Sequence, residues 1–335
     1  MTTGSNKSNS ETVLVTGGSG YLALFCIVKL LKEGYKVRTT VRKLSRKEDV
    51  LTSIKYSGLS VSDDEIEFVE ADLLSDNGWS DAVKGCKYIL HVASPFPPVQ
   101  PENEEDLIRP AVDGTLRVLK AARDDTNVKR VVLTSSTAAV AFGKPNENLG
   151  RPFTEEDWTF IDETCSAYGK SKTLAEKAAW NFIEKECDNK LELVTINPTY
   201  IFGPLLNTDV STSIDIISSI IKGVQSYAQV STGVVDVRDV ADIHYLAMIT
   251  EEAKGNRFIS ISSDSNVSRE YIARLFIEKL PELSKTITPP GNHPDQYKHR
   301  QISNEKAKRI LGWNPRPTNE TLLSTAKSLA DFNLI

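Results

Sequence analysis

Short apolar runs alternate with longer amphipathic stretches along the first 198 residues of this sequence. The runs are four to six residues long and are bounded by glycine, proline or polar residues, which is typical of buried strands. We predict strands at residues 13–16, 36–41, 66–69, 88–92, 130–133 and 193–197. Helical stretches separate them, so the repeated order of strand and helix favours a parallel, doubly wound sheet with right-handed crossovers.

Three of the helical stretches carry apolar residues at helical spacing, at residues 22–31, 104–122 and 166–186. The first of them directly follows the first predicted strand and a glycine-rich turn, and it ends at Glu33-Gly34. A strand, a tight turn and a helix in this order are typical of the unit that begins a nucleotide-binding fold.

Beyond Pro198 the alternation breaks down. Phe202-Gly203-Pro204 opens a loop before a predicted helix at 211–222, and the segments 234–237, 239–250 and 257–261 are expected to return to the sheet. We therefore predict an α/β fold in which a Rossmann-type doubly wound parallel sheet carries a smaller, mainly helical substrate lobe. The predicted boundaries are 11–198 for the Rossmann domain, to which 229–262 return, 199–228 and 263–335 for the substrate lobe, and 1–10 for a flexible tail.

Composition narrows the class of protein. Apolar residues make up 40% and charged residues 25% of the 335 positions, as in ordinary globular proteins. The formal net charge of −5 argues against a nucleic-acid partner, because phosphate backbones bind basic surfaces. No apolar run approaches the roughly 20 residues that span a bilayer, and the polar start lacks the apolar core of a secretory signal. Cys26, Cys86, Cys165 and Cys187 are widely spaced, so we expect free buried thiols and a cytoplasmic location.

The segment Gly17-Gly18-Ser19-Gly20-Tyr21-Leu22-Ala23 follows the first predicted strand and opens the first helix. It matches the dinucleotide fingerprint Gly-x-Gly-x-x-Ala in the context that makes this pattern informative. Its glycines allow a tight turn and a close approach of a pyrophosphate to backbone N–H groups, while the helix N-terminus favours anions. An ordinary glycine turn is the alternative. The predicted coenzyme contacts in this segment are Gly17, Ser19, Gly20, Tyr21 and Leu22.

Arg42 follows the second predicted strand, about 20 residues past the fingerprint, where an NAD-selective chain carries Asp or Glu for the ribose 2′-hydroxyl. Further basic residues follow it, among them Arg46 and Lys47. A guanidinium can bind a 2′-phosphate through two hydrogen bonds, so the cluster favours NADP, the alternative being a solvated basic turn. Asp72 and Leu73, after the third predicted strand, are placed to meet the adenine, although Asp72 could equally cap a helix.

Tyr168 and Lys172 stand one turn apart in the predicted helix at 166–186, so the phenol and the ammonium can share one site. A phenol has an ordinary pKa near 10, and a neighbouring ammonium makes release of its proton easier. Ser136, after the fifth predicted strand, can hydrogen-bond a substrate oxygen and stabilise negative charge that develops there. The three side chains together predict a carbonyl-reduction site, whereas an exposed aromatic-basic pair on a helix is the alternative.

The four histidines show no spacing typical of a metal site, so no metal is expected. His91 lies inside the fourth predicted strand and is interpreted as a core residue or as part of the coenzyme wall. The acidic pairs Glu104-Glu105 and Glu155-Glu156 are interpreted as acids at solvated helix starts rather than as catalytic carboxylates.

These motifs resemble the extended short-chain dehydrogenase/reductases, and within them the dihydroflavonol 4-reductase-like branch of NADPH-dependent aldehyde and ketone reductases. The likeness covers nearly the whole chain and rests on residues 13–21, 37–42, 71–73, 91–95, 132–136, 168–172, 197–199 and 236–240. The resemblance implies that Ser136, Tyr168 and Lys172 are catalytic and that the last two also meet the coenzyme. The further coenzyme contacts that it implies are Arg42, Asp72, Leu73, Ala93, its neighbour Ser94, and Pro198.

One departure from the family bears on the substrate. Cinnamoyl-CoA reductases carry Asn-Trp-Tyr-Cys-Tyr at the catalytic tyrosine, whereas this chain has Thr164-Cys165-Ser166-Ala167-Tyr168. We therefore expect an aldehyde or a ketone rather than a thioester as the substrate.

The leading hypothesis is an NADPH-dependent carbonyl reductase that converts a small aldehyde or ketone to an alcohol and acts as a monomer or a homodimer. A nucleotide-sugar epimerase or dehydratase recycles tightly bound NAD, so Arg42 disfavours it. A steroid dehydrogenase often accompanies a membrane segment, and none is visible in the sequence. A non-catalytic NADP-sensing regulator has no need of Ser136, Tyr168 and Lys172 together.

Substrate selection is expected in the segment 200–227 and the C-terminal helices, which would form a mobile wall over the nicotinamide. Phe202 and Leu205 are the first residues that we would change there. The candidate pocket residues, each of which is alternatively a core residue, are Phe96, Phe142, Phe153, Trp158, Tyr200, Phe202 and Tyr227.

Overall fold

A seven-stranded parallel sheet forms the centre of the protein in a computed structural model, which describes residues 11–95, 101–143, 150–188, 190–224, 231–265, 267–291 and 300–335. Its strand order is β10-β6-β5-β4-β1-β2-β3, so the chain runs outward from β1 in one direction and then in the other. The strands are β1 (Thr12–Val15), β2 (Lys36–Val41), β3 (Ile66–Glu70), β4 (Tyr88–His91), β5 (Arg130–Thr134), β6 (Glu192–Pro198) and β10 (Arg257–Ser260).

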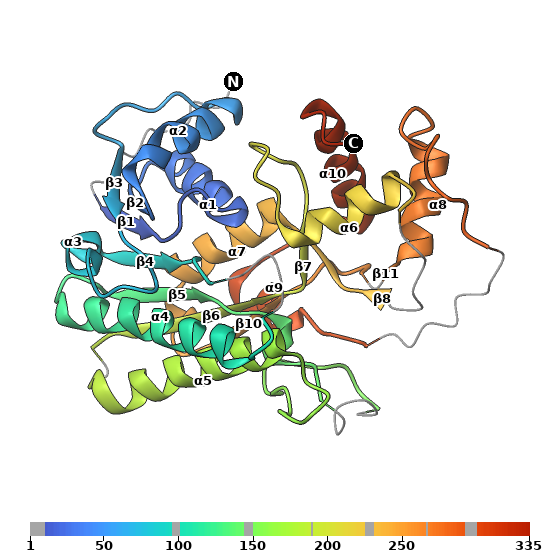
Figure 1. Cartoon of the computed structure of the whole chain (residues 1–335). Helices are drawn as coiled ribbons and strands as arrows, with labels where there is room; N and C mark the ends of the chain where they lie inside the picture. The colour runs from blue at the N-terminus through green and yellow to red at the C-terminus, as the bar shows by residue number, and fades with distance from the viewer. Residues whose placement is uncertain are drawn as a thin grey trace.

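Helices cover both faces of this sheet (Figure 1). Along β1 the alternation of side chains divides the two cores, because Val13 and Val15 pack into one apolar cluster and Leu14 into the other. The first cluster joins α1 (Tyr21–Lys32), α2 (Lys47–Tyr56), α7 (Val237–Ile249) and α9 (Glu305–Leu311). The second joins α3 (Trp79–Val83), α4 (Glu105–Asp124) and α5 (Ala167–Glu186), of which α4 and α5 run beneath the sheet in Figure 1.

A smaller group of elements lies beyond the carboxyl ends of the strands, at the right of Figure 1. It has an apolar cluster of its own, built largely from three helices. These elements are α6 (Thr212–Ile221), α8 (Arg269–Lys279), α10 (Thr318–Asp331), and two small sheets that pair β7 (Tyr200–Phe202) with β9 (Val234–Asp236) and β8 (Ser231–Thr232) with β11 (Val267–Ser268). Short 3₁₀ turns cover Leu44–Arg46, Thr137–Ala139 and Glu251–Ala253.

The α/β fold and all six strands predicted before Pro198 are confirmed, each to within one residue at either end. The prediction that 234–237 return to the main sheet is wrong. Strand β10 takes the edge beside β6, and β9 instead pairs with β7, which follows β6 after the chain leaves the sheet at Pro198. The helix α9 packs against α7 and β10. The domain boundaries stay a prediction.

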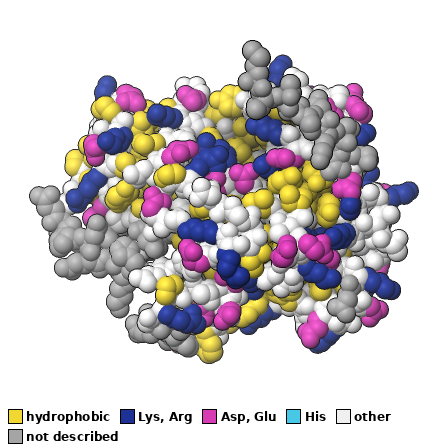
Figure 2. Space-filling model, turned by 180° about the vertical axis from the view of Figure 1, so that it is seen from behind, with side chains coloured by type: hydrophobic (Ala, Val, Ile, Leu, Met, Phe, Trp, Pro, Cys, Tyr) yellow, Lys and Arg dark blue, Asp and Glu magenta, His cyan; other side chains and the backbone are white. Residues whose placement is uncertain are grey.

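Charge is mixed over the molecule's surface. Figure 2 shows Lys and Arg side chains interspersed with Asp and Glu over the face seen from behind, in keeping with the net charge of −5. In the ranges that the structure describes, we find no helix with the length and apolar content needed to cross a bilayer.

A buried ion pair joins the amino ends of β5 and β6. Arg130 is 1% exposed and donates a hydrogen bond from Nε to Glu192 Oε2 at 2.8 Å. Its Nη1 donates to the carbonyl oxygens of Ala247 at 2.9 Å and Met248 at 3.0 Å, near the end of α7. The guanidinium therefore satisfies carbonyls at a helix C-terminus and holds α7 against the sheet.

We expect Arg130→Ala to lower the free energy of unfolding by about 3 to 5 kcal/mol, because it leaves the buried Glu192 carboxylate without its main partner. Urea unfolding followed by circular dichroism measures the change. The control is Lys308→Ala, which removes an exposed pair with Glu305 (2.9 Å) and should cost less than about 1 kcal/mol. Equal losses in the two variants would contradict this account of the Arg130 contacts.

Candidate active site

A pocket of about 530 Å³ opens at the carboxyl ends of β1 and β4, where the strand order reverses. This is the place at which doubly wound sheets bind ligands. The structure describes every residue predicted for the catalytic and coenzyme sites, and among them only Lys47 is missing from the lining. The predicted residues that line the pocket are Gly17, Ser19, Gly20, Tyr21, Leu22, Arg42, Asp72, Leu73, Ala93, Ser94, Ser136, Tyr168, Lys172 and Pro198.

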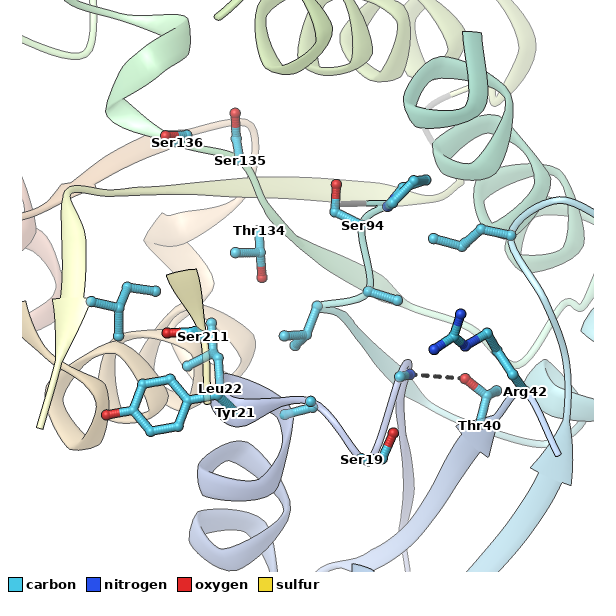
Figure 3. Close-up of a pocket in the computed structure, with 18 of the residues that line it drawn as sticks. Ser19, Tyr21, Leu22, Thr40, Arg42, Ser94, Thr134, Ser135, Ser136 and Ser211 are labelled. Carbon is cyan, nitrogen blue, oxygen red and sulfur yellow. Dashed lines mark hydrogen bonds between the residues drawn. The ribbon is translucent and has the colours of Figure 1, made fainter. Parts of the chain in front are cut away.

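The glycine turn between β1 and α1 has no room for side chains. Gly17 has a φ of +72°, and a Cβ there would lie 2.9 Å from Ala93 Cβ, while one at Gly18 would lie 2.1 Å from Thr39 Oγ1. The Gly17 amide donates a hydrogen bond to Thr40 Oγ1 at 2.9 Å (Figure 3). Neither a capping side chain nor an acid occupies the start of α1, so its partial positive charge faces the pocket. This cradle fits the pyrophosphate of a dinucleotide.

The basic end of the pocket lies at Arg42. Figure 3 shows Arg42 beside Thr40 and Ser19, with Ser135 and Ser136 at the opposite end of the same hollow. The Arg42 side chain is exposed, whereas Lys47 places its Nζ 5.7 Å from the centre of the Phe68 ring. The pocket therefore presents a cation at one end and hydroxyl groups at the other.

The helix α5 brings Tyr168 and Lys172 to the hydroxyl end. Ser166 caps this helix, and its hydroxyl accepts a hydrogen bond from the Gly169 amide at 3.1 Å. The Lys172 ammonium lies 5.9 Å from the centre of the Tyr168 ring. Ser136 hydrogen-bonds the Tyr168 side chain, so the three predicted catalytic side chains meet in one place.

Burial shifts the two titrating groups in opposite directions. It raises the pKa of Tyr168, against the effect of the Ser136 hydrogen bond, so the phenol keeps its proton at neutral pH. Burial lowers the pKa of Lys172 to about 8, and the nearby Glu176 carboxylate opposes this shift. At pH 7 the site therefore holds a protonated phenol beside an ammonium group.

His91 is a core residue, as one of its two interpretations proposed. Its side chain is 1% exposed, and Nδ1 lies 2.9 Å from Thr16 Oγ1, which itself accepts a hydrogen bond from the Ala93 amide. Burial, with a smaller effect of Lys172, lowers the pKa of His91 to about 3, so the imidazole is neutral.

The four cysteines are free and buried, as predicted.

The sequence analysis placed Phe202 and Leu205 in the substrate wall, and this prediction is wrong for both residues. Phe202 is 0% and Leu205 2% exposed, and both pack into the apolar cluster of α6, α8 and α10. Phe153 is likewise buried, and Trp158 stacks on the Arg257 guanidinium at 3.7 Å. Tyr200 and Phe142 are exposed, whereas Phe96 and Tyr227 lie outside the described residues.

Glu155 also differs from its prediction as a solvated acid. It is 7% exposed and accepts a hydrogen bond from the Ile259 amide at 3.0 Å, and burial raises its pKa. No helix begins there, because the described segment around it runs as turns and extended chain. The prediction that Glu104 is an acid at a helix start is confirmed, since this residue directly precedes α4. Its carboxylate pairs with Lys170 at 2.6 Å.

Several lining residues escaped the sequence analysis. Thr40 lies near the end of β2, two residues before Arg42. Its polar side chain beside a predicted coenzyme contact could have indicated that it lines the pocket. Thr134 ends β5 two residues before Ser136 and could have been added with it. The residues after Pro198 gave no local signal, because this segment reaches the pocket only through the tertiary fold. The missed residues include Thr40, Thr134, Thr199, Ile201, Ser211 and Ser213.

Comparison with known proteins agrees with this architecture. Residues 13–262 match the model of the NAD dependent epimerase/dehydratase family. The chain is 35% identical to cinnamoyl-CoA reductase CAD2 of Medicago truncatula over 332 residues, with 98% of each chain covered. It is 33% identical to an anthocyanidin reductase ((2S)-flavan-3-ol-forming) of Vitis vinifera, with 88% of each covered. The crystal structure of yeast methylglyoxal/isovaleraldehyde reductase Gre2 complexed with NADPH aligns at a TM-score of 0.84 and 30% identity, covering 96% of this chain and 99% of that one.

We expect the Lys172 side chain to titrate near pH 8, below the ordinary lysine value of about 10.4. It is charged below that pH and neutral above it. Between the two values the unfolded chain binds the extra proton, so the contribution of this group to stability rises with pH across that window. Carbon-13 NMR of lysine-labelled protein, assigned with Lys172→Arg, follows the titration. A signal that moves only with the bulk of the lysines would contradict it.

Proposed function

Because the chain belongs to the NAD dependent epimerase/dehydratase family, the extended short-chain dehydrogenase/reductases, we propose that it is an NADPH-dependent carbonyl reductase acting on small aldehydes or ketones. The observation that carries this proposal is the meeting of Ser136, Tyr168 and Lys172 in one pocket with the glycine cradle and Arg42. The pocket volume of about 530 Å³ lies within the range of sites that hold a cofactor or a small molecule.

The residues of the pocket fit NADP(H). The cradle at Gly17 would receive the pyrophosphate, and Arg42 would bind the 2′-phosphate through charge-assisted hydrogen bonds. Asp72 and Leu73 would border the adenine, and Lys172 and Pro198 the nicotinamide end. Asp72 accepts a hydrogen bond from the Leu74 amide at 2.9 Å, which shapes the turn after β3.

NADPH, when bound, supplies the hydride that attacks the carbonyl carbon. Ser136 hydrogen-bonds the carbonyl oxygen and holds it toward Tyr168, which gives the oxygen its phenolic proton. The product is an alcohol. Burial keeps Tyr168 protonated before the reaction, and the Lys172 ammonium stabilises the phenolate that remains.

Other reactions of the same family are less well supported. An epimerase or dehydratase that recycles NAD has no use for Arg42 at the ribose end of the pocket. The match to a protein named cinnamoyl-CoA reductase raises thioester reduction as a second candidate, which the sequence 164–168 disfavours. A sensor without turnover does not explain the three catalytic side chains.

The proposal extends to the setting of the enzyme. Four free, buried thiols favour a reducing compartment such as the cytoplasm. A monomer or a homodimer is proposed from the sequence, and sedimentation velocity distinguishes the two.

Tyr168→Phe should reduce turnover by about 10² to 10⁴-fold and leave NADPH binding nearly intact, because it removes the proton donor and little else. Oxidation of NADPH, followed at the nicotinamide absorbance, measures turnover with a panel of aldehydes, ketones and one aromatic coenzyme A thioester. The control is Tyr271→Phe, which makes the same change at a hydroxyl that bonds Asn319 outside the pocket. Wild-type turnover by Tyr168→Phe would rule out the mechanism, and a preference for the thioester would favour the second candidate.

Arg42→Ala should raise the KM for NADPH by about 10 to 100-fold and change the KM for NADH much less. The lost interaction is a charge-assisted hydrogen bond that only the 2′-phosphate can accept, worth about 1.5 to 3 kcal/mol. Arg309→Ala, which removes an equal charge from the exposed face of α9, should change neither constant. If Arg42→Ala affects both coenzymes equally, Arg42 lies near the site without selecting the phosphate.

A further inference from the structure

Glu176 lies on α5, four residues beyond Lys172 and eight beyond Tyr168. These spacings place all three on one face of the helix, which is the face that meets the sheet. Glu176 is 1% exposed and lines no part of the pocket, so it is a buried acid that the proposed reaction does not use directly.

The Glu176 carboxylate accepts hydrogen bonds from β6, from β10 and from the residue that follows β5. Oε2 accepts from Ser135 at 2.6 Å and from Asn197 at 2.8 Å. Oε1 accepts from Thr195 at 2.9 Å and from Arg257 Nε at 2.7 Å. Longer hydrogen bonds, each of 3.3 Å, come from Trp180 Nε1 to Oε1 and from Arg257 Nη2 to Oε2. A carboxylate offers about four acceptor positions, so the Glu176 carboxylate is fully satisfied.

Two of these partners, Ser135 and Asn197, directly precede pocket residues. Ser135 directly precedes Ser136. Asn197 directly precedes Pro198, and its amide also donates to the Ser136 carbonyl oxygen at 3.1 Å. Glu176 therefore joins the backbone that carries Ser136 to the helix that carries Tyr168 and Lys172.

Stability alone gives a weak reason for this arrangement. Burying an ion pair costs desolvation energy, and well-packed apolar residues in its place are often equally stable. The Glu176–Arg257 pair lies where β5, β6 and α5 converge on the pocket. A comparable buried pair, Arg130–Glu192, joins the same two strands at their opposite ends, away from the pocket.

From this geometry we infer that Glu176 is a positioning residue for the reduction: its buried carboxylate holds Ser136 and Lys172 in the arrangement that Tyr168 needs. The inference rests on the proposed function, since it assigns Glu176 a part in that reaction. Glu176 touches neither substrate nor coenzyme and acts through the residues that do.

The charge of Glu176 has a second effect. It favours the ammonium form of Lys172 and so opposes the lowering of the pKa of Lys172 by burial. Other charged or titratable groups around this junction include His91 from β4, Arg257 from β10, Glu155 and Lys306 against Arg257, and the Glu104–Lys170 pair between α4 and α5. His244 from α7 also lies there, with Nε2 2.7 Å from Thr134 Oγ1, and burial lowers its pKa to about 4. Of these, His91 is neutral above its pKa of about 3, so it adds no charge to oppose Glu176 at working pH.

The test is Glu176→Gln, which keeps the shape of the side chain and removes its charge. We expect kcat to fall by about 10 to 100-fold, a loss of the size that follows when the partners orienting metal-binding side chains are removed. We also expect the Lys172 titration, read by carbon-13 NMR of lysine-labelled protein, to move to lower pH. Glu176→Asp keeps the charge and should return that titration toward the wild-type value.

The matched control is Glu192→Gln, the same substitution in the buried pair at the far ends of β5 and β6. It should lower stability and leave both kcat and the Lys172 titration unchanged. If Glu176→Gln does not fold, the double variant Glu176→Gln with Arg257→Gln leaves no unpaired buried charge, and the same two measurements apply to it.

An unchanged Lys172 titration, or an unchanged kcat, in a folded Glu176→Gln protein overturns the inference. Losses of kcat that are equal in the Glu176 and Glu192 variants also overturn it, since they would reflect stability alone. The NMR titration needs neither substrate nor turnover. If the wild-type protein reduces no carbonyl compound, the proposed function fails, while the link between Glu176 and Lys172 is still measured.

Discussion

The reversal of strand order at β1 is the constraint on which the rest of the structure depends. A parallel sheet that grows outward from β1 in both directions sends the chain away from the same point to opposite faces. The turns after β1 and β4 therefore separate and leave a crevice at the carboxyl edge. Thr16 joins the two turns there, because its backbone amide bonds Leu90 and its hydroxyl bonds His91 and the Ala93 amide. The glycine cradle follows directly after this joint and is bonded to β2 through the Gly17 amide and Thr40 Oγ1.

Two buried ion pairs hold the half of the sheet that carries the chemistry. Arg130–Glu192 ties the amino ends of β5 and β6 to α7, and Glu176–Arg257 ties their carboxyl ends to α5 and β10. Each pair is surrounded by further hydrogen bonds, so the cost of removing the charges from water is offset within the fold. The positions of Ser136 and Lys172 thus depend on polar contacts in the core as much as on apolar packing.

Burial serves the proposed reaction in two ways. The same low-dielectric surroundings that keep Tyr168 protonated also weaken the hold of Lys172 on its proton. A phenol that retains its proton is ready to donate it. Because the pKa of Lys172 is about 8, neighbouring charges decide how much of it is protonated near neutral pH. The Glu176 carboxylate opposes this effect of burial and favours the ammonium form of Lys172. In the segment after Pro198, Phe202 and Leu205 serve a different purpose, since they pack into the apolar core between α6, α8 and α10.

The sequence by itself determined the sheet, the coenzyme cradle and the catalytic side chains, because each is encoded locally. A strand shows its apolar run, a phosphate turn needs its glycines, and Tyr168 and Lys172 meet because one helix sets their spacing. Only the tertiary structure decided which residues beyond Pro198 reach the pocket, which aromatic residues are core, and that β9 pairs with β7 instead of joining the main sheet. Glu155 was interpreted as a surface acid and Glu176 was not singled out for the same reason: their partners, Ile259 and Arg257, lie about 80 to 100 residues away in the chain. Local patterns report the spacing of neighbours along the chain, and they carry no record of which distant donors a folded core will bring to a carboxylate.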